Sequence, residues 1–197
     1  MWYTCYEALP VRGEMPMEIH EFTEGEREEL IDQAFKGMHI ERKRLTKEDL
    51  EREIIDYLSK THPCSLATCG KDGTPRISVV DYVNEGLTIF IFSEGGDKFK
   101  NLKENNKVAV GIGTSAKTVK SVRGINLWGV AEVFAEDTPE FAHGMKLFSP
   151  TLRTQEKEVG FPIELPKGTV RMIRVTPTKI VYNHNSKGIA NVHWEGR

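Results

Sequence analysis

The strongest constraint on the fold comes from residues 87–101. The apolar run Leu87–Phe92 predicts a fully buried strand, and it leads directly into Ser93-Glu94-Gly95-Gly96-Asp97-Lys98 and a short helix. A tight hairpin turn would not need two adjacent glycines at the start of a helix. Glycine lets successive backbone N–H groups turn into one concavity, and the positive end of the helix dipole adds to them. This junction therefore predicts an anion-binding site.

The side chains of the junction match a phosphate monoester. Lys98 supplies a full positive charge and Ser93 a hydroxyl, and Phe92 and Gly96 flank them. The alternative is that the glycine pair forms an ordinary loop and that Lys98 is one of several solvated lysines. The junction alone does not decide between these two interpretations.

A second candidate lies on the preceding strand, which is predicted at residues 76–83. On a strand, Arg76 and Ser78 share one face while Ile77 and Val79 share the other. A cationic and a hydroxyl side chain therefore project together beside an apolar edge, which would suit both the phosphate and the flat ring of one ligand. The alternative is an exposed arginine at a strand end and a serine on a solvated face.

A third candidate is the strand predicted at Gly124–Phe134. Asn126 and Trp128 lie on one of its faces, and Ile125 and Leu127 on the other. Trp128 is either a core residue, the commoner location for tryptophan, or the wall of a ligand site. A buried Asn126 would need a polar partner, which a heteroaromatic ligand or a backbone group would provide.

The helix and strand patterns along the chain predict a mainly β, α+β fold. A capping-box-like start at Thr46 and apolar periodicity predict one clear helix before His62-Pro63. Two more short helices are predicted, at Lys98–Asn105 and after Thr138, and the first three strands are expected to form an antiparallel meander with a small barrel or sandwich as the result. The expected strands are Cys64–Cys69, Arg76–Val83, Leu87–Phe92, Val108–Gly113, Gly124–Phe134, Thr169–Thr176 and Lys179–Tyr182, the last two split by Pro177.

Three segments are expected along the chain. Residues 1–45 form an N-terminal extension of unknown role, with a helix predicted from Glu24 to Phe35. Residues 46–185 form the main domain, and residues 186–197 form a C-terminal tail. Within the main domain, the prolines and charges of residues 149–168 predict a long loop. Our hypothesis is that this loop covers a substrate.

The composition argues against several classes of function. A net charge of −2 and a pI of about 6.3 provide no basic field for nucleic acid. No apolar stretch approaches the roughly 18 residues of a membrane span, and the N-terminus lacks the pattern of a signal peptide, so we expect a cytoplasmic protein away from membranes. The three cysteines form no C-x-x-C motif and the six histidines show no metal-ligand spacing, so we expect no metal site.

These motifs resemble the FMN-binding split-barrel family related to pyridoxamine 5′-phosphate oxidase. The likeness covers about residues 46–183, and its most specific part is the motif G-x-P-R, which ends at Arg76, followed by G-G-D-K-F-x-N-L. The resemblance implies a six-stranded antiparallel split β-barrel with short flanking helices, assembled as a homodimer with one FMN at each of two clefts between subunits. It also implies that Arg76, Lys98 and Ser93 hold the phosphate, that the backbone of Ile77–Val79 lies along the isoalloxazine ring, and that Asn126 or Trp128 approaches from the partner chain.

The function implied by the resemblance is that of an FMN-dependent oxidoreductase acting on an unidentified small-molecule redox substrate. The chain departs from the true oxidases at Asp81, where a substrate-binding lysine is expected, and it lacks their C-terminal signature, which argues against pyridoxamine phosphate as the substrate. Three alternatives remain. The cofactor is the deazaflavin F420, or it is haem with His184 or His193 as an axial ligand, or the protein is a non-enzymatic module that binds a flavin or another ligand.

Overall fold

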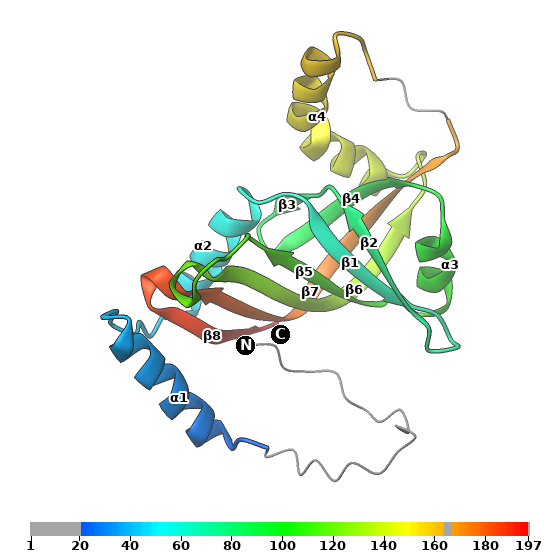
Figure 1. The fold of residues 1–197 in the computed structure, drawn as a ribbon. Coiled ribbons are helices and arrows are strands. Elements are labelled where there is room, and N and C mark those ends of the chain that lie inside the picture. Colours follow the sequence, from blue (N-terminus) through cyan, green and yellow to red (C-terminus); the bar gives the residue numbers. More distant parts are fainter. Residues whose placement is uncertain (1–20, 164–166, 197) are drawn as a thin grey trace.

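The computed structural model describes residues 21–163 and 167–196 and folds most of them into one β-sheet flanked by helices (Figure 1). The helices are α1 Glu24–Gly37, α2 Lys47–Leu58, α3 Asp97–Glu104 and α4 Pro139–Val159. The strands are β1 Cys64–Cys69, β2 Pro75–Val80, β3 Val83–Glu85, β4 Thr88–Glu94, β5 Lys107–Gly113, β6 Arg123–Phe134, β7 Val170–His184 and β8 Ile189–Glu195. Two 3-10 turns, η1 Val119–Ser121 and η2 Asn185–Lys187, contact each other beside the sheet.

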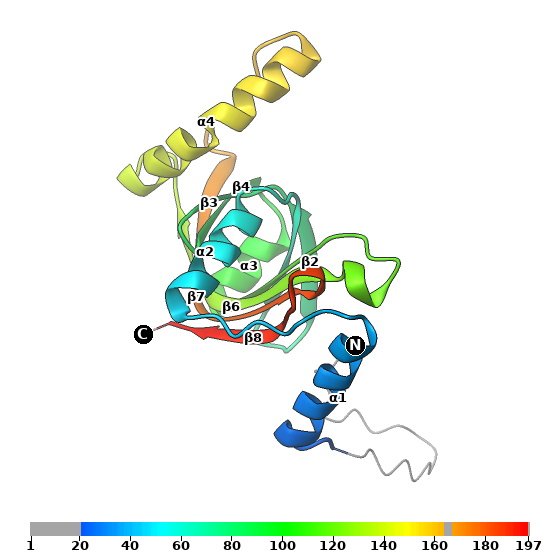
Figure 2. The same cartoon turned by 90° about the vertical axis from the view of Figure 1, so that its left-hand side faces the viewer.

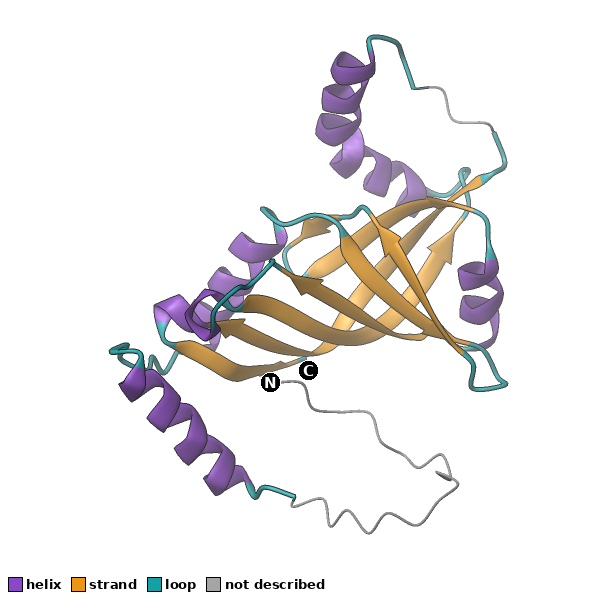
Figure 3. Ribbon diagram, viewed as in Figure 1, coloured by secondary structure: helices purple, strands orange, loops and turns teal. Residues whose placement is uncertain are grey.

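The strands follow the order β2-β1-β5-β6-β7-β4-β3, and β8 pairs with the second half of β7. The pairs formed by these strands are antiparallel. The sheet curls into an open half-barrel, with β2 at one edge and with β3 and β8 as edge strands on the other side (Figure 3). The predicted class, a mainly β antiparallel split barrel with flanking helices, is confirmed, although the described residues form eight strands rather than six.

Helices α2 and α3 lie at opposite ends of the curled sheet (Figures 1 and 2). Helix α2 begins as its sequence predicts, because the Thr46 hydroxyl accepts the backbone N–H of Asp49 at 3.1 Å. Its buried Leu50, Ile54 and Leu58 join the main core inside the barrel. The sequence therefore predicted this element and its buried face correctly.

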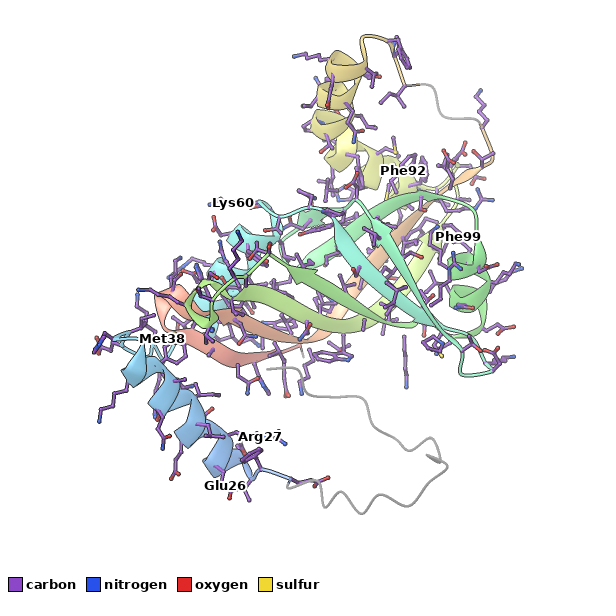
Figure 4. All side chains as sticks on the ribbon, in the orientation of Figure 1. Glu26, Arg27, Met38, Lys60, Phe92 and Phe99 are labelled. Carbon is purple, nitrogen blue, oxygen red and sulfur yellow. The ribbon has the colours of Figure 1, made fainter. Side chains whose placement is uncertain are left out.

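Strand β4 is buried on both faces, which explains its continuous apolar sequence. Ile89 and Ile91 belong to the core inside the barrel. Phe90 belongs to a second cluster, formed with α4 outside the barrel, and Phe92 packs against this cluster at the base of α4 (Figure 4). The strand thus links two separate hydrophobic cores.

The predicted meander is correct for its first pair of strands, β1 with β2, and wrong for its second. Strand β2 lies at one edge of the sheet, whereas β4 pairs with β7 and with β3, a short strand expected partly as a turn. The crossover between β2 and β3 is fixed by Tyr82, whose buried hydroxyl donates to the Leu58 carbonyl at 2.9 Å. Alternation of apolar residues identifies strands, but it does not identify their partners.

Two expectations about the C-terminal part also need correction. Strand β7 runs through Pro177 without a break. The register between β6 and β7 shifts at this point, between Trp128 and Gly129, which marks a bulge. A bulge tolerates proline because the strand pairing there does not require its missing N–H group. In addition, the segment expected as a tail contains β8, whose Trp194 is buried against the main core.

The expected loop at residues 149–168 is wrong for its first half. Helix α4 continues through Pro150 to Val159 and ends at Gly160, which adopts a left-handed conformation with φ 81°. Proline removes one helical hydrogen bond, and the ribbon bends within this helix (Figure 3). Phe141 and Phe148 nevertheless anchor the helix in the second cluster. Residues 164–166 of the expected loop lie outside the described residues.

The N-terminal extension carries α1, which projects away from the barrel (Figures 1 and 2). Arg42 in the following linker pairs with Glu28 at 2.8 Å and with Asp32 at 2.7 Å. The linker then contacts the barrel, where the N–H of Lys43 donates to the Gly188 carbonyl at 2.9 Å. Residues 1–20 of the extension lie outside the described residues, and none of the described helices is long and apolar enough to cross a membrane.

Gly129→Ala should lower the free energy of unfolding by about 2–3 kcal/mol. A Cβ atom at this position would lie 2.5 Å from the backbone carbonyl oxygen of Thr176, so the two central strands would have to move apart. Gly113→Ala is the matched control, because a Cβ there meets open space. Urea unfolding of both variants checks the prediction, and equal losses of stability would contradict it.

Candidate functional site

The start of strand β2 lies beside the start of helix α3. Arg76 Nη1 donates to Asp97 Oδ2 at 3.2 Å, which connects the two elements directly. The Arg76 side chain is 43% exposed, so it is accessible from solvent. The long-range packing of α3 against β1 and β6 holds this arrangement in place.

Lys98 lies in the first turn of α3, close to Arg76. Its ammonium group donates to the carbonyls of Glu94 at 3.1 Å and Gly95 at 2.9 Å, and its side chain is buried. Burial lowers the pKa of Lys98, and the nearby charge of Arg76 lowers it further. Two of the three ammonium donors therefore stabilise the loop, and the two neighbouring cations create a positive field.

Gly96 allows the close turn between strand β4 and helix α3. It is the N-cap of α3 with φ 107°, a conformation that favours glycine, and no side chain caps the helix there. The first N–H groups of α3 therefore lack a side-chain partner. We call Arg76, Gly96 and Lys98 the cationic corner. Its positive charge and its position at an uncapped helix N-terminus suit an anion.

Two other predicted residues of this region have different surroundings. The Ser93 hydroxyl donates to the Glu94 carbonyl at 3.1 Å, so it lies at the same junction but is engaged with the backbone. The ring of Phe92 packs against Phe141 and Phe148 of α4, with centroid distances of 6.3 and 6.0 Å. Phe92 therefore packs against the second hydrophobic cluster.

The outer face of the sheet carries an unusual apolar surface beside the cationic corner. Ile77 and Val79 point outward from β2 with exposed fractions of 69% and 70%. The sheet register aligns residues of β2, β1, β5 and β6 in rows. The row that begins at Ile77 ends at Trp128, and the row that begins at Val79 ends at Asn126. We call this surface the outer strip: Ser65, Ala67, Ile77, Val79, Ala109, Gly111, Asn126 and Trp128.

The middle of the outer strip is flat because its residues are small. Ala67 and Ala109 separate Ile77 from Trp128, and Ser65 and Gly111 occupy the same place in the next row. Trp128 is 40% exposed, so the interpretation of this residue as part of the core is wrong. The inward neighbours Ile125 and Leu127 are buried, as the alternation of the strand predicted.

Lys179 is a neighbour of the outer strip that sequence reasoning missed. It pairs with Trp128 across β6 and β7, and its ammonium lies 5.9 Å from the centre of the Trp128 ring. The hydroxyl of Thr178 donates to the Trp128 carbonyl at 3.2 Å and supports the bulge at this place. No local sequence pattern places Lys179 beside Trp128, because the two residues are brought together by the pairing of β6 with β7.

The two histidines considered as haem ligands lie on different faces. His193 of β8 pairs with Val181 in the row that continues from Val79 and Asn126, and it is exposed on the outer face. His184 is partly buried, with its Nδ1 3.3 Å from the Tyr182 hydroxyl. Burial lowers the pKa of His184. Of these two histidines, His193 shares a face with the outer strip.

Many solved structures share the fold, among them the following three. General stress protein 26 from Bacillus anthracis is 15% identical, with a TM-score of 0.54, over 74% of this chain and 98% of that chain. The haem storage protein HutZ from Vibrio cholerae is 20% identical, with a TM-score of 0.52, over 65% of this chain and 89% of that chain. An FAD-binding protein from Mesorhizobium loti is 16% identical, with a TM-score of 0.51, over 66% and 90%. At these identities the likeness concerns the fold alone.

The family comparison covers the elements that build the site. No match is found among curated protein sequences. A family model described as pyridoxamine 5′-phosphate oxidase matches residues 50–184, from within α2 to the end of β7. This segment contains the whole cationic corner and the whole outer strip, and it makes up more than half of the chain. The chain therefore belongs to the family related to pyridoxamine 5′-phosphate oxidase.

Proposed function

We propose that this protein is a homodimeric FMN-binding flavoprotein that acts as an oxidoreductase on a small redox substrate. The observation that carries the proposal is the meeting of the cationic corner and the outer strip along one strand. Arg76 and Ile77 are consecutive on β2, one beside α3 and the other on the outer face. An anion-binding corner next to a flat apolar surface suits a ligand with a phosphate and a planar ring.

The residues of the site fit FMN. Arg76 and the N-terminus of α3, which has no side-chain cap, would hold the phosphate, and the charge of Lys98 would add to the positive field. Strand β2 pairs only with β1 among the described strands, so its other edge keeps unpaired N–H and C=O groups from Ile77 to Val79. That edge would bind the polar rim of the ring.

The outer strip supports the proposed dimer. Ile77, Val79 and Trp128 together expose a contiguous apolar surface on one sheet face, and such surfaces usually mark an interaction site. The flat middle of the strip would let two sheets approach closely. A second copy is the partner that fits, because the same strip on that copy would cover these residues and bring its Asn126 and Trp128 near the ring.

The flavin would supply hydride or electron transfer when bound. The residues of this chain would bind and orient it and would exclude water from the ring once the second copy covers the strip. We assign no side chain as a proton donor, so the catalytic part of the proposal rests on the cofactor and on its position.

Haem is the second candidate, favoured by the position of His193. This exposed imidazole continues the row of Val79 and Asn126 on the outer face. An imidazole at the rim of a flat apolar surface suits an axial ligand. HutZ from Vibrio cholerae, which has a similar fold, is described as a haem storage protein.

A parallel titration with FMN, haem and F420 tests the proposed function. We expect FMN to bind in the micromolar range or tighter, with a shifted flavin spectrum, and the other two to bind more weakly. Preferential haem binding that is lost in His193→Ala would support the second candidate instead. Binding of F420 in preference to FMN would also overturn the proposal.

A further inference from the structure

We propose that Asp97 is a built-in competitor for the cofactor phosphate and so sets the preference of the site between phosphorylated and unphosphorylated flavins. In the structure its carboxylate pairs with Arg76, and it would have to release this arginine for a phosphate to bind. The inference rests on the proposed function, because it concerns the same site, but it assigns a role to a residue that phosphate binding alone would not require.

The contacts of Asp97 place it between two cations. Its Oδ2 accepts from Arg76 Nη1 at 3.2 Å, and its Oδ1 accepts from Lys100 Nζ at 2.9 Å. Arg76 comes from β2 and Lys100 from α3, so one carboxylate bridges the two elements that form the cationic corner. Among the described residues, Asp97 is the ion-pair partner of Arg76.

Asp97 lies at the N-terminus of helix α3, the end of a helix that favours an anion. It is the first residue of α3 after the N-cap Gly96, where no side chain caps the helix. Negative charge is stabilised near a helix N-terminus. Lys98, in contrast, directs its ammonium toward the carbonyls of Glu94 and Gly95. Asp97 therefore occupies the electrostatic position that a phosphate would take, beside the one arginine of the corner.

The exposure of the pair permits exchange with a ligand. Arg76 and Asp97 are 43% and 55% exposed, and ion pairs at such positions are weak, so a phosphate dianion can displace the carboxylate. After displacement, the negative charge of Asp97 stays close to the phosphate and opposes its binding. Hydrogen bonding and charge from Lys100, together with the charge of Arg76, lower the pKa of Asp97. The carboxylate therefore remains ionised at neutral pH, and the competition persists there.

Asp97→Asn tests the proposal because it removes the charge and keeps the shape. We expect the affinity for FMN to rise roughly fivefold to twentyfold, because both the competing ion pair and the repulsion disappear. Riboflavin has the same ring without the phosphate, so its affinity should change by less than about twofold. Asp97→Glu keeps the charge and should leave the ratio of the two affinities close to that of the wild type.

Asp32→Asn is the matched control. It also removes one carboxylate that pairs with an arginine, but it lies on α1, far from α3 in the ribbon view (Figure 1). It should not alter the ratio of FMN to riboflavin affinity. If Asp97→Asn binds both flavins but leaves the ratio of FMN to riboflavin affinity unchanged, or weakens FMN binding, this inference is overturned and the proposed function is not. A chain that binds neither flavin in any of these forms would overturn the proposed function and this inference together.

Discussion

Arg76→Ala should weaken FMN binding by about tenfold to a hundredfold and change riboflavin binding by less than about threefold. The guanidinium is the accessible cation of the corner, since Lys98 is buried and engaged with two carbonyls. Its removal also frees the negative charge of Asp97 next to the phosphate. Titration of each flavin, followed by quenching of its fluorescence, measures both affinities.

Arg52→Ala is the matched control for this prediction. Arg52 is an exposed arginine on α2 that pairs with Asp49, and it lies at the other end of the barrel (Figure 1). Its replacement should leave both affinities unchanged. If Arg76→Ala binds FMN as tightly as the wild type does, the phosphate is held elsewhere and the assignment of the cationic corner is wrong.

The double variant Ile77→Glu, Val79→Glu should be monomeric at concentrations where we expect the wild type to be a dimer. The two side chains are the most exposed large apolar residues of β2, and a second copy would bury them. A carboxylate buried without a partner costs several kcal/mol, so the dissociation constant should rise by at least about a hundredfold. Light scattering during gel filtration measures the mass of each form.

The control for this variant is Val159→Glu, which introduces the same charge at an exposed valine of α4. It should leave the dimer intact, because α4 lies outside the outer strip. A double variant that remains dimeric would show that the outer strip is not the interface. Loss of FMN together with loss of the dimer would further support a cofactor that lies between two copies.

Local patterns predicted the strands and helices well, because each pattern depends on neighbouring residues. The cap at Thr46, the alternation around Leu127 and the apolar run of β4 all identified the correct elements. Pairing was less predictable, since register depends on contacts between distant segments. For the same reason the breaks predicted at Pro177 and Pro150 do not occur, because the bulge and the second cluster that tolerate these prolines are formed by distant residues.

The candidate site shows the same limit. The sequence identified Arg76 and Lys98 as neighbouring cations, and the structure brings them close together. It did not reveal that Asp97 holds Arg76, because this pair joins β2 to α3 across 21 positions of the chain. Likewise, alternation placed Trp128 on a face with Asn126, but only the fold shows that this face is exposed.

The proposed FMN-binding dimer is tested most directly by gel filtration of the full chain after incubation with FMN, with light scattering and flavin absorbance recorded together. We expect a dimer that retains about one FMN per chain, the stoichiometry of two equivalent clefts. A colourless peak, or a monomer that carries the flavin, would contradict it.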